Sequence, residues 1–303
     1  MNVLSLFDGI SCGRLALERA GFTSIKYYAS EISTAAITVS EHNYPDLIRL
    51  GDVQNWKDWD INWNSIDLLI GGTPCQGFSF AGKQLNFNDP RSKLFFVYLD
   101  ILNHIKSLNP NVRFLLENVK MKREYQDIIS KSLGVEPIMI NSSLVSAQNR
   151  KRNYWANWGI KQPQDKGILL SDIVLDGIVE KDKAYCLTCR SGNARDYFKK
   201  HQSNIAFIPS SSGEYKIENG KINIVFKKSP DQNAYTFDVN IPDGRYNIRP
   251  LSPVECERLQ TLPDHYTSSV GITERYNQLG NGWSVDTLSL IHISEPTRHL
   301  RIS

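Results

Sequence analysis

Long hydrophobic runs, cysteine and net charge are all scarce in this chain of 303 residues, and each scarcity excludes a class of protein. No stretch approaches the ~20 consecutive apolar residues of a membrane-spanning helix. The first residues, MNVLSLFDG, hold no basic segment and no cleavage site, so we expect no secretory signal peptide. Five scattered cysteines are too few for a disulfide framework, and a net charge of +3 does not by itself indicate a nucleic-acid partner. We therefore expect a soluble intracellular protein.

Strand and helix patterns alternate along the first 120 residues. Short apolar runs predict strands at Val3–Phe7, Ile25–Ser30, Leu47–Leu50, Ile66–Ile70 and Phe114–Leu116. Helical patterns cover 13–20, 34–42 and 94–108. This alternation predicts an α/β fold with a parallel sheet covered on both faces, and ligands of such sheets bind at the carboxyl ends of the strands. The polar residues expected at that edge are Asp8, Glu31, Asp52, Cys75 and Glu117.

Residues 161–247 have a different pattern, in which helical periodicity fades and short β-like runs alternate with polar loops. Glu214–Phe226 is typical of a hairpin, with Asn219-Gly220 as its two-residue turn. A helix start follows at Ser252, with Pro253 in the first position and Glu255 completing a capping box. We infer an α/β domain that carries a β-rich insertion.

The predicted division of the chain ends in an atypical tail. Pro296 would interrupt the apolar helix that is expected after Val285, and we expect the tail to be dispensable beyond Leu290. The parts are an α/β domain over 1–160, the insertion over 161–247, a return to the α/β domain over 248–290 and the tail over 291–303.

The loop Phe7-Asp-Gly-Ile-Ser-Cys-Gly13 joins a predicted strand to a predicted helix. Glycines there let the backbone approach a ligand, and the helix N-terminus offers free amide groups. Glu31 ends the next strand and is placed to accept hydrogen bonds from a ribose. The loop lacks the third glycine of a dinucleotide site, and its acidic residue would repel a pyrophosphate. A nucleoside that carries a positive charge fits this loop better, although a tight turn with no ligand is the alternative.

The sharpest feature is the segment Gly71-Gly-Thr-Pro-Cys-Gln-Gly-Phe-Ser79. A cysteine on a Gly/Pro-rich loop after a buried strand is exposed at the ligand edge of the sheet, as a nucleophile requires. Glu117 ends the next predicted strand and is a candidate general acid. Most cysteines are small buried hydrophobes, but the loop and the partner carboxylate favour a catalytic Cys75.

At this point the sequence resembles the cytosine-5 DNA methyltransferases, of bacterial and phage type with similarity to the animal de novo branch. The resemblance covers about residues 1–158 and 248–290 and depends on the order and spacing of its motifs. These motifs are Phe7-Asp-Gly, Glu31, Gly51-Asp-Val53, Gly71–Ser79, Glu117-Asn-Val119, Gln148-Asn-Arg-Lys-Arg152, Arg249–Gln260 and Gln278–Val285. It implies a Rossmann-like methyltransferase fold that binds S-adenosylmethionine, with 161–247 as a smaller target-recognition domain.

The resemblance also implies the roles of individual residues. Cys75 matches the thiolate that adds to carbon 6 of cytosine, and Glu117 matches the carboxyl that hydrogen-bonds the exocyclic amine and ring nitrogen 3. Arg152 matches the residue that holds the carbonyl oxygen of the base, with Arg150 supporting it at the backbone. Without the resemblance, this basic run would be interpreted as a solvated surface. The implied cofactor-binding residues are Phe7, Asp8, Gly9, Ser11, Gly13, Glu31, Ile32, Asp52, Val53, Pro74, Leu94, Asn281, Trp283 and Ser284.

The implied substrate is a cytosine flipped out of duplex DNA, and the loop 77–89 resembles the segment that closes over such a base. The implied setting is a restriction–modification system with a separate endonuclease, or a solitary enzyme, in the cytoplasm of a bacterial or phage-infected cell. A monomer is expected from the family. The alternatives are a tRNA cytosine-5 methyltransferase with the same core and a non-catalytic DNA-binding protein on the same fold.

Three smaller features receive structural interpretations. Cys186-Leu-Thr-Cys189 has zinc-like spacing but no second pair, so we expect no metal site. The tryptophans at 56, 59 and 63 are expected to pack against the sheet. Four lysines of the insertion, Lys199, Lys200, Lys227 and Lys228, are candidates for phosphate contacts, although such lysine pairs on small β domains are more often plain solvated surface.

Overall fold

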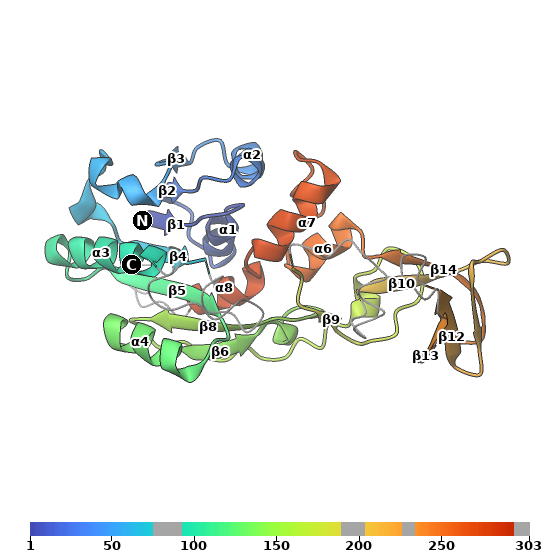
Figure 1. Cartoon of the computed structure of the whole chain (residues 1–303). Coiled ribbons are helices and arrows are strands. Elements are labelled where there is room, and N and C mark those ends of the chain that lie inside the picture. The colour runs from blue at the N-terminus through green and yellow to red at the C-terminus, as the bar shows by residue number, and fades with distance from the viewer. Residues whose placement is uncertain (75–92, 189–203, 226–233, 294–303) are drawn as a thin grey trace. The chain divides into compact units, whose positions relative to one another are not determined.

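A computed structural model of the chain describes residues 1–74, 93–188, 204–225 and 234–293. The chain divides into two compact units (Figure 1). Unit 1 comprises 1–142, 151–164 and 282–303, and unit 2 comprises 143–150 and 165–281. The insertion expected over 161–247 lies almost wholly within unit 2, which also includes residues on either side of it.

Unit 1 is built on a seven-stranded sheet in the order β3-β2-β1-β4-β5-β8-β6. Its strands are β1 (Asn2–Leu6), β2 (Lys26–Ser30), β3 (Ile48–Arg49), β4 (Leu68–Gly72), β5 (Arg113–Val119), β6 (Ile138–Asn141) and β8 (Lys151–Ala156). The first five strands along the chain pair in parallel, as the alternating pattern predicts. β8 lies between β5 and β6 and runs antiparallel to both, which the sequence pattern did not predict.

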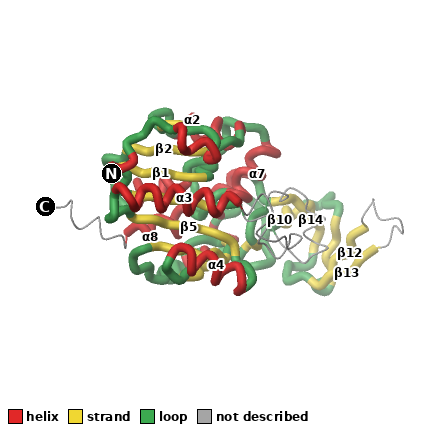
Figure 2. The backbone as a smooth tube through the Cα atoms, turned by 60° about the vertical axis from the view of Figure 1, so that its left-hand side comes forward, coloured by secondary structure: helices red, strands yellow, loops and turns green. Residues whose placement is uncertain are grey.

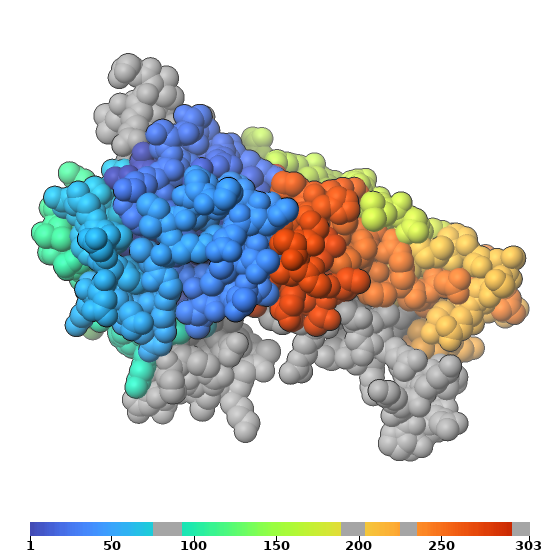
Figure 3. All heavy atoms as spheres, turned by 90° about the horizontal axis from the view of Figure 1, so that it is seen from above, coloured from blue at the N-terminus to red at the C-terminus, as the bar shows by residue number. Residues whose placement is uncertain are grey.

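Helices pack on both faces of this sheet because successive residues of its strands point in opposite directions. Leu4 and Leu6 of β1 contribute to a core shared with the helices α3 and α4, which lie across one face (Figure 2). On the other face Ile70 of β4 lies directly against the start of α1. The helices of unit 1 are α1 (Cys12–Arg19), α2 (Thr34–Asn43), α3 (Lys93–Leu108), α4 (Arg123–Leu133) and α8 (Val285–Ile293), with 3-10 turns η1 (Val53–Asp58) and η2 (Trp63–Ser65). The N-terminal segment, blue in Figure 3, makes up much of the surface of unit 1 on the face seen there.

Unit 2 contains a five-stranded sheet in the order β10-β14-β11-β12-β13, antiparallel at every pairing. Its strands are β10 (Ile205–Pro209), β11 (Tyr215–Glu218), β12 (Lys221–Val225), β13 (Ala234–Asp238) and β14 (Gly244–Pro250). The other elements of the unit are η3 (Ser142–Leu144, whose first residue is the last of the first segment of unit 1), β7 (Gln148–Asn149), η4 (Leu170–Asp172), β9 (Ala184–Tyr185), α6 (Pro253–Leu259) and α7 (Ile272–Asn281). Asn219 and Gly220 both have positive φ between β11 and β12, so the predicted hairpin turn is confirmed.

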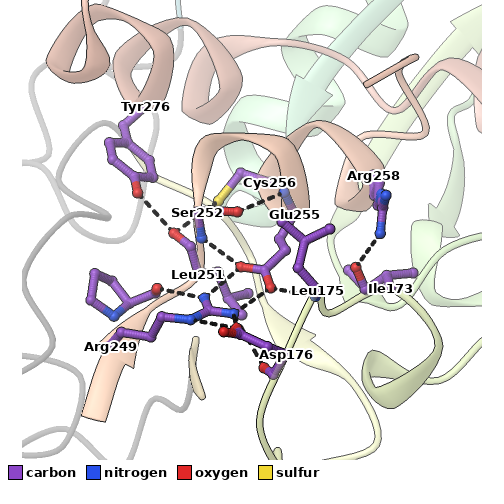
Figure 4. Close-up of polar contacts among 11 residues, drawn as sticks. Ile173, Leu175, Asp176, Arg249, Leu251, Ser252, Glu255, Cys256, Arg258 and Tyr276 are labelled. Atoms are coloured by element: carbon purple, nitrogen blue, oxygen red, sulfur yellow. Dashed lines mark hydrogen bonds and ion pairs between the residues drawn. The ribbon is translucent and has the colours of Figure 1, made fainter. Parts of the chain in front are cut away.

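The predicted helix start at Ser252 is also confirmed, and it belongs to a buried ion-pair network (Figure 4). Glu255 is fully buried and accepts two hydrogen bonds of 2.7 Å from the Arg249 guanidinium. The backbone N–H groups of Leu175 and Ser252 donate to the same carboxylate, at 2.7 and 2.6 Å. Arg249 in turn binds Asp176, so the network ties the end of β14, the start of α6 and the loop at 175–176 together.

Glu255→Gln should destabilise the folded protein at neutral pH and change its response to acid. Burial alone would raise the pKa of Glu255, but the hydrogen bonds from Arg249, Leu175 and Ser252 outweigh it and hold the pKa below its usual value. The ionised carboxylate therefore stabilises the fold above the pKa it has in the unfolded chain, and this contribution is lost as the pH falls through the lower folded-state pKa. We expect a loss of about 1–3 kcal/mol at pH 7 that shrinks toward pH 3, measured by urea unfolding. Glu274→Gln, at an exposed site in α7, is the control; equal losses in the two variants would contradict the role of the network.

The C-terminal helix α8 extends beyond the point where the sequence suggested a break. It continues to Ile293, so Ile291 and His292 are helical and buried rather than part of a detached tail. Trp158 donates its indole N–H to the carbonyl oxygen of Ile291 at 3.3 Å, and its ring stacks with that of His292. Helix α8 thus ends about one turn later than expected. Its last turn is held because Ile291 and His292 pack against Trp158, which follows β8.

Truncation after Leu290 should therefore destabilise the protein, against the expectation that residues beyond Leu290 are dispensable. Removing Ile291 and His292 empties a buried volume, for which we expect a loss of about 2–5 kcal/mol, measured as the free energy of unfolding. A chain that ends at Ile293 keeps all of α8 and should match the full chain. Equal stability of the two truncated chains would show that the packing of 291–292 is unimportant.

No helix in the described part of the chain is long and apolar enough to cross a membrane.

Candidate active site

The loop between β1 and α1 has an unusual backbone. Phe7, Gly9 and Ser11 all have φ near +60°, a left-handed conformation that residues other than glycine rarely adopt. Such strain persists only where the surroundings hold it. Ser11 precedes α1, and its side chain does not cap the helix.

The Asp8 carboxylate holds this loop from the inside. It is 4% exposed and accepts hydrogen bonds from the hydroxyls of Ser5 (2.7 Å), Tyr27 (2.8 Å) and Ser11 (2.5 Å). Burial raises the pKa of Asp8, and although the three hydroxyls counteract it, the pKa stays above its usual value; nearby Glu31 adds to the rise. The Asp8 side chain thus binds hydroxyl groups of the protein itself. A ligand at this loop would therefore meet the loop's backbone and not the Asp8 carboxylate.

Glu31, at the end of β2, connects the first loop to the second strand. Its Oε2 accepts the Gly9 N–H at 2.8 Å, and its Oε1 accepts the N–H groups of Ile32 and Ser33, both at 2.8 Å. A carboxylate has about four acceptor positions, so one remains for a hydroxyl of a ligand. The Ile32 side chain is 70% exposed beside it and offers an apolar contact surface. These residues fit a nucleoside.

The end of β3 contributes the next predicted residues. The Asp52 carboxylate accepts the Gln54 N–H at 2.9 Å and caps η1, and Val53 is buried at the start of that turn. Pro74 and Leu94 are half-buried; Pro74 directly precedes the segment 75–92, and Leu94 is the second residue after it. Cys75 and the predicted closing loop 77–89 lie outside the described residues.

Glu117 and Arg152 are brought together by the unpredicted antiparallel strand. Val119 pairs with Arg152, so the beginning of β8 meets the end of β5. Arg152 Nε lies 2.9 Å from Glu117 Oε1, and the Trp283 indole N–H donates to Glu117 Oε2 at 3.0 Å. Glu117 is 8% exposed. The site therefore presents a carboxyl group of fixed orientation beside a guanidinium at the ligand edge of the sheet.

Asn118 ties β5 to Thr73 at the end of β4, a contact that sequence reasoning missed. Its side-chain amide donates to Thr73 Oγ1 at 3.0 Å and to the Thr73 carbonyl oxygen at 3.3 Å. The strand that carries Glu117 is thereby tied to the residues that precede the cysteine. An amide directly after the candidate acid was the only signal in the sequence.

The remaining predicted residues belong to both units. Arg150, in unit 2, is buried and donates to the carbonyl oxygens of Leu187 and Gly280, both at 3.3 Å, and to Cys186 Sγ at 3.2 Å. Asn281 ends α7 in unit 2, whereas Trp283 and Ser284 begin the last segment of unit 1 and are both buried. Among the described residues no three His, Cys, Asp or Glu side chains form a group that could hold a metal ion; Cys189 is outside them.

A family model described as C-5 cytosine-specific DNA methylase matches residues 1–293. The chain belongs to this family. The predicted family and the predicted class of enzyme, a DNA cytosine-5 methyltransferase, are therefore confirmed. The predicted α/β fold with a separate β-rich part is confirmed as well.

Individual relatives agree with this assignment. The chain is 28% identical over 316 residues to the type II methyltransferase M.HpaII of Haemophilus parainfluenzae, covering 94% of this chain and 86% of that protein. In fold it is similar to the methyltransferase EhMeth of Entamoeba histolytica, with a TM-score of 0.67 at 15% identity over 96% of each chain. It is also similar to a DNMT2 variant of Spodoptera frugiperda, with a TM-score of 0.63 at 21% identity over 96% of this chain and 98% of that one. Methyltransferases of this family generally use S-adenosylmethionine.

Asp8→Asn should make the stability of this methyltransferase less dependent on pH. Because the folded-state pKa of Asp8 is raised, the unfolded chain releases the proton first as the pH rises above the ordinary value of about 3.9. The contribution of this carboxyl is thus present at low pH and is lost as the pH rises toward neutral. We expect the stability of Asp8→Asn relative to wild type to improve from pH 4 to pH 7 in urea unfolding. Asp60→Asn, at an exposed position, is the control; parallel pH profiles of wild type and Asp8→Asn would contradict a raised pKa.

Proposed function

We propose that this chain methylates carbon 5 of a cytosine that has been flipped out of duplex DNA. The observation that carries the proposal is the Glu117–Arg152 pair, which lies at the end of β5 and is tied through Asn118 to Thr73, two residues before Cys75. In a chain of this family, such a constellation supports the chemistry of a covalent cytosine adduct.

The chain's own residues would act in a defined order. The Cys75 thiolate attacks carbon 6 of the ring, and the electron pair of the 5,6 double bond moves toward carbon 5. Glu117 hydrogen-bonds the exocyclic amine and ring nitrogen 3, and Arg152 holds the carbonyl oxygen, so that both stabilise the charge that develops. S-adenosylmethionine, when bound, supplies the methyl group that carbon 5 acquires. Loss of the proton from carbon 5 then restores the double bond and expels the Cys75 thiolate.

The cofactor would be held at the first three strand ends of unit 1. The backbone of 7–13 and the N-terminus of α1 offer amide groups, Glu31 an acceptor for the ribose, and Ile32 an apolar surface for the adenine. Asp52 with Val53, Pro74 with Leu94, and the segment at 281–284 complete the proposed set. Arg150 is proposed to support Arg152 at the backbone, and its own guanidinium is held by the carbonyl oxygens of Leu187 and Gly280 within unit 2.

The proposed partners follow from the same assignment. Unit 2, with its antiparallel sheet, holds the target-recognition residues, and duplex DNA is the substrate. The relatives named as type II methyltransferases support a setting in restriction–modification with a separate endonuclease. A monomer in the cytoplasm is part of the same proposal.

Expression of the chain in a methylation-free bacterial host should produce 5-methylcytosine within one short sequence motif, detected by bisulfite sequencing. Cys75→Ala should abolish methylation, because no adduct can form. Cys256→Ala, which removes a buried thiol of α6 outside the site, is the matched control and should retain it.

Two outcomes would contradict the proposal. Methylation by Cys75→Ala would rule out the assigned nucleophile. Unmethylated DNA from a folded wild-type protein that binds S-adenosylhomocysteine would rule out a DNA substrate, and bisulfite sequencing of host tRNA would then separate the tRNA alternative from a non-catalytic protein.

A further inference from the structure

The Trp283 indole occupies a junction of unit 1 that its predicted place in the cofactor pocket does not explain. Its N–H donates to Glu117 Oε2 at 3.0 Å, and the residue is almost completely buried. Trp283 lies in the short connection between α7 and α8, whereas Glu117 lies on β5. The contact therefore links residues 166 positions apart in the chain.

Two glycines make room for this ring. A Cβ atom added at Gly72 would lie 2.8 Å from Trp283 Nε1 and 2.9 Å from its Cζ2, and one added at Gly13 would lie 3.3 Å from its Cζ3. The glycines at 13 and 72 belong to the loop segments that the sequence associated with cofactor and nucleophile. In the structure Gly72 leaves space at the indole atom that binds Glu117, whereas a Cβ at Gly13 would meet Ile70 Cδ1 (2.6 Å) and the Tyr27 hydroxyl (2.8 Å) before the edge of the ring.

The hydrogen-bonding capacity of Glu117 shows why this contact is compatible with catalysis. Arg152 Nε binds Oε1 and Trp283 Nε1 binds Oε2, which occupies one acceptor position on each oxygen. A carboxyl group has about two positions on each oxygen, so one on each remains for the base: one oxygen can accept from the exocyclic amine, and the other can carry the proton that Glu117 donates to ring nitrogen 3. Two donors on opposite oxygens fix the plane of the carboxylate, and Arg152 alone would leave it free to rotate.

We infer that the Trp283 indole N–H is a positioning group for Glu117, distinct from any contact of the ring with cofactor. Since a transition-state interaction requires its group to be oriented in advance, the N–H contributes to the rate of methyl transfer and not to cofactor affinity. The inference rests on the proposed function, because it assigns Trp283 to the same reaction.

Trp283→Phe tests this directly, because it removes the N–H and keeps an aromatic ring. The free energy of a hydrogen bond to a charged group corresponds to a factor of about 10 or more in rate. We therefore expect kcat for DNA methylation to fall about 10-fold or more. KM for S-adenosylmethionine and the Kd of S-adenosylhomocysteine should stay within about 2-fold of the wild-type values. Trp59→Phe is the matched control, since Trp59 Nε1 has no hydrogen-bond partner among the described residues, and it should leave kcat unchanged.

A second measurement does not depend on activity. The chain has six tryptophans, so a proton–nitrogen correlation spectrum should contain six indole N–H signals, and Trp283→Phe identifies one of them by its loss. Glu117→Gln should shift that signal, whereas Glu124→Gln, on the exposed side of α4, should not. Gly72→Ala should shift the same signal and lower kcat as Trp283→Phe does, because its methyl group displaces the ring.

The outcomes are distinguishable. An unchanged kcat in Trp283→Phe, an increase in KM alone, or an indole signal that ignores Glu117→Gln would each overturn the positioning role. A wild-type protein that binds S-adenosylhomocysteine but methylates no DNA would overturn the proposed function instead, and the spectrum would still decide whether Trp283 binds Glu117.

Discussion

A buried carboxylate must find its hydrogen-bond donors within the protein, and the architecture of this methyltransferase is organised around that requirement. Four acidic side chains are buried in the described part of the chain: Asp8, Glu117, Glu255 and Glu257. Each accepts hydrogen bonds from the protein's own groups, and at least one donor to each comes from another segment of the chain. Asp8 fixes the first loop, Glu117 fixes the edge of the catalytic sheet, and Glu255 fixes the start of α6. Glu257, bound by Arg275 at 2.8 Å and by Thr267, connects α6 to α7.

The antiparallel strand β8 has the largest effect on the site. A wholly parallel sheet would collect only residues that follow strands, such as Glu31 and Glu117. Because β8 runs in the opposite direction, its first residues come to the same edge, and this adds a guanidinium to a set of carboxylates. Reversal of one strand therefore places a positive and a negative side chain together at this edge of the sheet, which suits the proposed binding of a base with donor and acceptor groups.

Local patterns predicted much of the fold. The strands and helices up to β5, the Asn219-Gly220 turn and the capping box at Ser252 depend on neighbouring residues, so they are visible in the sequence. The meeting of Glu117 and Arg152 was implied by the family resemblance but not by the strand pattern, because it needs the pairing of β5 with β8. The inward direction of Asp8, the role of Asn118 and the Trp283–Glu117 contact were not predicted, since each depends on which side chains pack together across the fold. The positions and partners of Cys75 stay a prediction.

The shared space of Gly13, Gly72 and Trp283 also constrains how such an enzyme can evolve. A larger residue at position 72 fits the fold only together with a smaller residue at position 283. A smaller residue at position 283 alone leaves a void beside Glu117, because Gly72 has no side chain to fill it. Single substitutions at these positions therefore pass through an enzyme with a displaced carboxylate. The three sites are expected to change together across lineages or not at all. They would then form a correlated set, although Gly13 lies in α1, Gly72 ends β4 and Trp283 lies more than 200 residues further along the chain.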